Sequence, residues 1–80
     1  MQANEYVAYV TMLSTMPAEL RARVLANYPG TGYDNDVQMN DIIYLMNPMR
    51  FGVEAYRHFL KPGNGRDYLH KVLAGQVLAD

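Results

Sequence analysis

The apolar residues at the start of the chain recur at the spacing of an amphipathic helix. Tyr6, Val10 and Leu13 fall on one helical face, and Asn4 just before them is a residue type favoured at an N-cap. The pattern therefore predicts a first helix at about residues 5–14.

A second helix is predicted after a short break. Thr15 is a candidate N-cap, and Pro17 suits the first helical turn, where its missing N–H leaves no helical hydrogen bond unmade. Residues 27–30 read Asn-Tyr-Pro-Gly, a sequence that ends helices. The apolar stripe between these signals consists of Leu20, Val24, Leu25 and Tyr28. Turn-forming residues at positions 31–35 then predict the main loop of the chain.

The second half of the chain predicts three further helices. Asp36 is a candidate N-cap for the third helix, whose apolar face would comprise Met39, Ile42, Ile43 and Met46. Asn47 followed by Pro48 is a cap and first-turn signal for a fourth helix at about residues 48–61. A stop rich in glycine and proline separates it from a fifth helix at about residues 66–78.

These elements predict an all-α fold, a compact bundle of four to five short helices that forms one domain over residues 1–80. No segment alternates apolar and polar residues along the length of a strand, so we expect no β-sheet. Half of the residues are hydrophobic and 19% are charged. This composition is too apolar for a disordered chain.

The absence of cysteine limits how so small a domain can be stabilised. Without cysteine, neither disulfides nor thiolate metal sites can supplement the core. We therefore expect a homo-oligomer or a complex with another protein. The first residues lack the basic region of a signal peptide, and no run approaches the roughly 20 apolar residues of a transmembrane helix. These features predict a cytoplasmic protein without a membrane partner.

Charge is unevenly distributed along the chain. Positions 1–49 hold five acidic and two basic residues, whereas positions 50–71 hold five basic and two acidic residues. Arg57, Lys61 and Arg66 lie where the fourth predicted helix ends and the fifth begins, so we predict that they form a positive patch. Such a patch would speed the encounter with an acidic partner protein. The alternative is that these side chains only solvate their helix faces.

Several catalytic and metal-binding patterns are present only in incomplete form. Residues 34–36 supply alternating oxygen ligands as in a calcium loop, but the twelfth position holds Leu45 where a glutamate is needed. His58 and His70 are the only histidines, and their spacing is not that of a helical metal pair. Ser14 is the only serine, and nothing in the sequence pairs it with a histidine. We therefore predict no catalytic residue, no metal site and no cofactor.

The chain is rich in tyrosine and methionine, with seven and six residues. We expect part of this set in the core, namely Tyr56, Tyr68, Met39 and Met46. The other tyrosines are more than so small an interior can bury: Tyr6, Tyr9, Tyr28, Tyr33 and Tyr44. Tyrosine and methionine are typical of surfaces where proteins bind one another. We therefore predict that Tyr33 and Tyr44 bind a partner, together with the positive patch.

Taken together, the features favour a small non-enzymatic protein-interaction module. It would be an adaptor or inhibitor that binds a larger protein, of the kind encoded on phages and mobile elements. The alternative is a nucleic-acid-binding helical domain that uses Arg50, Arg57, Lys61, Arg66 and Lys71. A sequence pI of about 6.0 is low for such a domain. The break between the second and third predicted helices is also too long for a helix-turn-helix.

Overall fold

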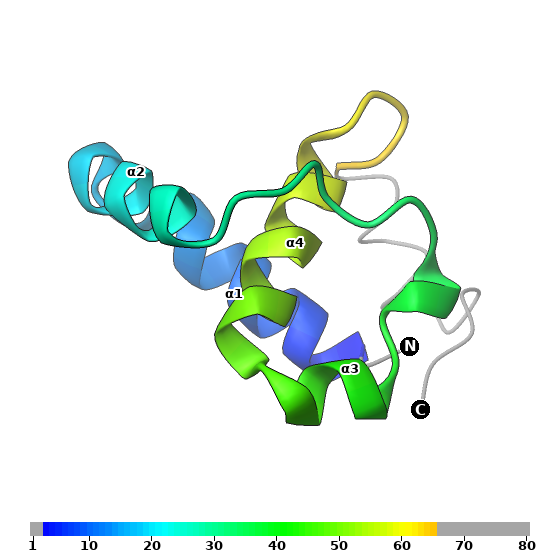
Figure 1. The fold of residues 1–80 in the computed structure, drawn as a ribbon. Coiled ribbons are helices and arrows are strands. Elements are labelled where there is room, and N and C mark those ends of the chain that lie inside the picture. The colour runs from blue at the N-terminus through cyan, green and yellow to red at the C-terminus, as the bar shows by residue number, and fades with distance from the viewer. Residues whose placement is uncertain (1–2, 66–80) are drawn as a thin grey trace.

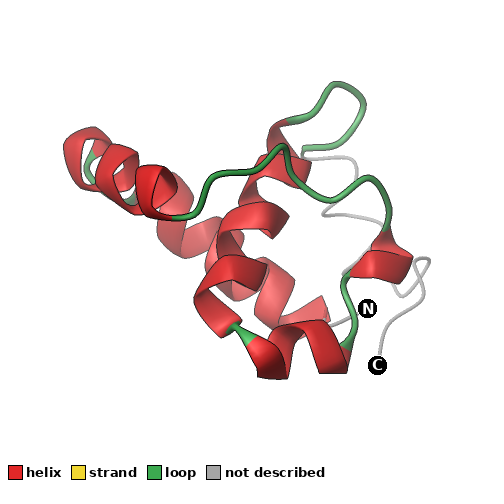
Figure 2. Ribbon diagram, in the orientation of Figure 1, coloured by secondary structure: helices red, strands yellow, loops and turns green. Residues whose placement is uncertain are grey.

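The structure, a computed structural model, describes residues 3–65 of the 80-residue chain. Its elements are α1 (Ala3–Thr15), α2 (Ala18–Asn27), the 3₁₀ helix η1 (Asp36–Gln38), α3 (Asp41–Met46) and α4 (Pro48–Leu60) (Figure 1). The described part of the chain contains no strand (Figure 2), which confirms the predicted all-α class. The predicted fifth helix lies outside the described residues.

α1 and α4 cross in the centre of the molecule and form most of its core (Figure 1). Tyr6 and Val10 of α1 pack with Phe51 and Ala55 of α4, and Met39 joins them from the segment between η1 and α3. All five side chains are buried. The inward face predicted for the first helix is therefore confirmed, and so is the core position predicted for Met39.

A second apolar cluster joins α2 to the pair of central helices. Its buried members are Leu13, Val53 and Tyr56. Half-buried side chains from the second half of α2 and its end pack against it, namely Val24, Leu25 and Tyr28. Leu20 was predicted in the same stripe but is 47% exposed. The reason is that only the second half of α2 reaches the core.

Three of the predicted helix caps are wrong. Asn4 lies within α1, which already includes Ala3. Thr15 is the last residue of α1, and its hydroxyl donates a hydrogen bond back to the Thr11 carbonyl oxygen at 2.9 Å. The residue that caps α3 is Asn40 rather than Asp36, because its side chain accepts the Ile43 N–H at 3.0 Å. An asparagine that satisfies a free N–H begins a new helix at that point. The long third helix predicted from the sequence is therefore divided into η1 and α3.

Gly52 allows α1 to approach α4 closely. It is buried within α4, and a Cβ atom at this position would lie only 2.2–2.8 Å from ring atoms of Tyr9. The Tyr9 ring in turn packs edge-on against Phe51, with the ring centroids 6.5 Å apart. Glycine is about 1 kcal/mol less favourable than alanine inside a helix. At position 52 the missing side chain makes room for the Tyr9 ring against the backbone of α4.

We predict that Gly52→Ala destabilises the protein although alanine is the better helix former. Overpacking a core costs roughly 1–3 kcal/mol, which outweighs the propensity gain of about 1 kcal/mol. In a Tyr9→Ala background the clash is absent, so the same substitution should stabilise the chain by up to about 1 kcal/mol. Urea unfolding of the parent, both single variants and the double variant measures this reversal of sign. A Gly52→Ala protein more stable than the parent would contradict the packing.

Candidate functional site

Arg57, the first member of the predicted positive patch, is directed at the end of α2. Its guanidinium donates hydrogen bonds to the carbonyl oxygens of Leu25, at 2.9 Å, and of Tyr28. It also forms an ion pair with the Glu54 carboxylate at 2.6 Å, and both side chains of the pair are largely buried. Arg57 therefore connects α4 to the segment that leaves α2.

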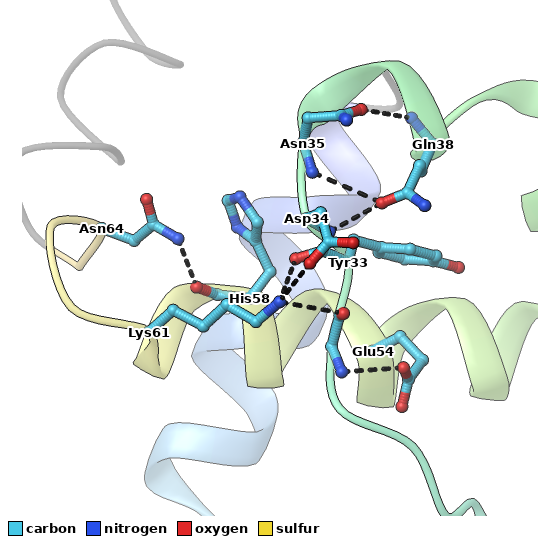
Figure 3. A network of polar contacts seen from close by, with 9 residues as sticks. Tyr33, Asp34, Asn35, Gln38, Glu54, His58, Lys61 and Asn64 are labelled. Carbon is cyan, nitrogen blue, oxygen red and sulfur yellow. Dashed lines mark hydrogen bonds and ion pairs between the residues drawn. The ribbon is translucent and has the colours of Figure 1, made fainter.

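Lys61 holds the next part of that segment, which we call the linker (residues 28–35; Figure 3). Its ammonium group donates to the carbonyl oxygens of Gly32 at 3.1 Å and Tyr33 at 2.9 Å, and it pairs with Asp34 at 3.0 Å. Glu54 binds the same stretch through its carboxylate, which accepts the Gly32 N–H at 2.9 Å. The backbone carbonyl of Glu54 accepts the Tyr33 N–H at 3.3 Å.

We call Glu54, Arg57 and Lys61 the linker clamp. Glu54 and Arg57 lie at positions i and i+3 and therefore share one face of α4, and Lys61 is the residue that ends the helix. Gly32 fits against this face with a φ of +90°, and a Cβ atom there would lie within 2.7–2.9 Å of α4 atoms around Arg57. Arg57 and Lys61 contact the linker, and Arg57 also contacts Leu25 of α2 and Glu54. That these two residues bind a partner stays a prediction. Arg66 lies outside the described residues.

α3 exposes most of its apolar side chains. Ile42, Leu45 and Met46 are 70%, 73% and 78% exposed, and Ile43 is exposed as well. The prediction that Met46 lies in the core is therefore wrong, as is the inward face predicted for Ile42 and Ile43. We call these four side chains the α3 surface.

Tyr44 determines which side of α3 faces the core. Its ring packs edge-on against Phe51, with the ring centroids 5.4 Å apart, and it is the only residue of α3 that is not exposed. Asn47 ends α3 and caps α4, as predicted, by accepting the Arg50 N–H at 3.1 Å. α3 has only six residues between the Asn40 and Asn47 caps. Tyr44 therefore packs against the core, and the other apolar side chains of α3 face outward.

A pocket of about 270 Å³ lies beside the α3 surface. It is lined by Tyr33, Ile43, Met46, Asn47, Arg50 and Phe51. The Tyr33 ring is tilted against the fully buried Phe51, with centroids 6.0 Å apart. Since Ile43 and Met46 belong both to the pocket and to the α3 surface, the two features form one continuous apolar region.

Tyr33 and Arg50 bring polar groups to this apolar pocket. Partial burial, with a smaller contribution from the Glu54 carboxylate, raises the pKa of Tyr33, and Arg50 offsets part of that rise. The phenol is therefore neutral at physiological pH and can donate a hydrogen bond. Of the two tyrosines predicted to bind a partner, Tyr33 lines the pocket, whereas Tyr44 packs against Phe51 on the inner side of α3. The partner role of both stays a prediction.

One sequence signal for the α3 surface was available. Residues 42–46 are apolar at every position, and a short helix that packs on one side cannot bury all of them. The pattern thus indicated an exposed apolar face. It did not indicate that Tyr44 would be the residue turned inward, nor that Arg50 would reach the same pocket.

The remaining candidate motifs have structural roles where the structure describes them. The Asn35 side chain accepts the N–H groups of Val37 and Gln38, so the acidic loop forms an Asx turn into η1. His58 is buried with its Nδ1 3.0 Å from the Tyr6 hydroxyl. Among residues 3–65, no group of three or more His, Cys, Asp or Glu side chains is placed to hold a metal ion. No helix in that range has the length and apolar character needed to cross a membrane.

We predict that Glu54→Gln destabilises the fold by roughly 2–3 kcal/mol, because it leaves the Arg57 guanidinium partly buried without its carboxylate. The matched control is Glu19→Gln, which breaks the exposed ion pair with Arg23 at 3.2 Å. Exposed pairs contribute less than about 1 kcal/mol. Chemical unfolding of both variants measures the difference, and equal effects would contradict a stabilising role for the linker clamp.

Comparisons with known proteins identify a family for the chain but no role. No curated protein and no solved structure matches it. A family model matches residues 1–80, and the chain therefore belongs to DUF6639, a family of unknown function.

Proposed function

We propose that this member of DUF6639 is a small non-enzymatic protein-interaction module, an adaptor or inhibitor, and that it binds a larger protein through the α3 surface. One observation supports this more than any other. Ile42, Leu45 and Met46 are each at least 70% exposed on a helix of six residues. Contiguous exposed apolar side chains on a small soluble protein are typical of binding sites.

The composition of this region also supports a protein partner. Complete burial of one leucine, isoleucine or methionine side chain is worth about 1.5–3 kcal/mol, so covering the α3 surface supplies a substantial driving force for association. Methionine, tyrosine and arginine are enriched at protein interfaces. Met46, Tyr33 and Arg50 line the same pocket, which makes this part of the surface suited to a protein ligand.

A nucleic-acid-binding role has less support. It requires Arg57 and Lys61 to contact phosphates, but both cationic groups already bind linker carbonyl oxygens and carboxylates of the same chain. The sequence pI of about 6.0 also favours a protein partner. The compartment that we propose, the cytoplasm, rests on the sequence features given above.

We predict that Leu45→Asp removes partner binding. Tagged chains are expressed in the organism that encodes the protein, and the captured proteins are quantified by mass spectrometry after nuclease treatment. Leu45→Asp should lower partner recovery by about tenfold or more, because a carboxylate buried in an apolar interface is strongly unfavourable. The matched control is Leu20→Asp, which alters an exposed leucine on α2 and should leave recovery unchanged.

Two results would contradict the proposal. Recovery that survives Leu45→Asp would exclude the α3 surface as the binding site. Recovery that is lost on nuclease treatment of the parent chain would favour the nucleic-acid alternative.

We further predict that the α3 surface associates with a second copy when no partner is present. Two exposed apolar faces of this kind are covered most simply by each other. Analytical ultracentrifugation at increasing micromolar concentration should give a mass above the 9.1 kDa of the monomer. Leu45→Asp should restore the monomer mass. A parent chain that remains monomeric throughout would contradict self-association.

A further inference from the structure

We infer that the pocket beside α3 is the anchor site for an acidic apolar segment of the partner protein. One large apolar side chain of the partner occupies the pocket, and an aspartate or glutamate close to it in the partner's sequence binds Arg50 and Tyr33. The inference rests on the proposed function and adds the chemistry of the partner to it.

The size and lining of the pocket indicate a single anchor side chain. Its volume is about 270 Å³, just below the range of roughly 300–1,000 Å³ that holds small-molecule ligands and cofactors. Phe51, Ile43 and Met46 make the lining apolar. Interface anchors of this type are apolar or aromatic side chains that enter well-packed pockets on the partner.

The polar groups at the pocket indicate a carboxylate. Within residues 3–65, the Arg50 guanidinium and the Tyr33 hydroxyl have no hydrogen-bond or ion-pair partner, in contrast to Arg57 and Lys61. The Glu54 carboxylate is near enough to raise the pKa of Tyr33, but it forms an ion pair with Arg57 at 2.6 Å. Arg50 is the one charged residue among those that line the pocket. A carboxylate there would accept a charge-assisted hydrogen bond from Arg50 and a second hydrogen bond from Tyr33.

The continuity between pocket and α3 surface indicates a protein segment rather than a free organic acid. Ile43 and Met46 line the pocket, whereas Ile42 and Leu45 lie on the same short helix outside it. A small acid in the pocket would leave those outer side chains in water. A peptide segment that inserts one side chain can continue across α3 and cover them.

The test is a selection of random peptides, displayed on phage, against the immobilised full chain. We expect the enriched peptides to share a large apolar residue with aspartate or glutamate within two positions. The same selection on Arg50→Glu should lose the acidic preference. Arg23→Glu carries the same charge change at an exposed position on α2 and should retain that preference. Circular dichroism of both variants checks that their helicity is unchanged.

The affinity of one selected peptide for each variant then separates the contributions of Arg50 and Tyr33 to binding. Fluorescence anisotropy should show a loss of about tenfold or more for Arg50→Glu, of about threefold for Tyr33→Phe, and of less than about twofold for Arg23→Glu. Enriched peptides without acidic residues that are still lost on Leu45→Asp would overturn this inference and leave the proposed function standing. Peptides that bind Leu45→Asp as well as the parent chain would overturn both.

Discussion

The ring of Phe51 is fully buried and packs against three tyrosine rings from three separate segments of the chain. Tyr9 comes from α1, Tyr33 from the linker and Tyr44 from α3, with centroid distances of 6.5, 6.0 and 5.4 Å. Aromatic pairs in such edge-on and tilted arrangements are favourable beyond the area that they bury. The position of each segment relative to α4 depends on this one side chain. The exposure of the α3 surface follows from it, because α3 meets the core through Tyr44.

The linker clamp is the polar counterpart of this aromatic cluster. The Lys61 ammonium group donates to the Tyr33 carbonyl oxygen, and the Glu54 carbonyl oxygen accepts the Tyr33 N–H. Hydrogen bonds outside the apolar core therefore help to place the Tyr33 ring against Phe51. The part of the pocket wall that Tyr33 forms therefore depends on contacts with Glu54 and Lys61, which lie more than 20 positions later in the sequence. Loss of the clamp would affect the proposed docking site without any change to the residues that line it.

The sequence predicts the helical class, the inward face of α1 and the Asn47 cap, because these depend on local spacing and local hydrogen bonds. It does not predict the orientation of α3. Periodicity shows which residues share a face, but in so short a helix every candidate face is apolar, and the choice was made by the contact between Tyr44 and Phe51. Nor could it predict the contacts of Arg57, whose partners Leu25 and Tyr28 lie about 30 positions earlier. The segregation of charge along the chain predicts a patch for a partner but gives no sign of the contacts that Arg57 and Lys61 make within the chain.

The proposed function requires that another protein covers the outer face of α3 in the cell. Site-specific photo-cross-linking tests it most directly, with a benzophenone amino acid placed at Leu45 in one chain and at Leu20 in another. Both positions are exposed leucines, one on α3 and one on α2. After irradiation of living cells, we expect a discrete protein adduct from position 45 that disappears in an Ile42→Asp background, and none from position 20. Equal adducts from both positions, or none from position 45, would contradict the proposed function.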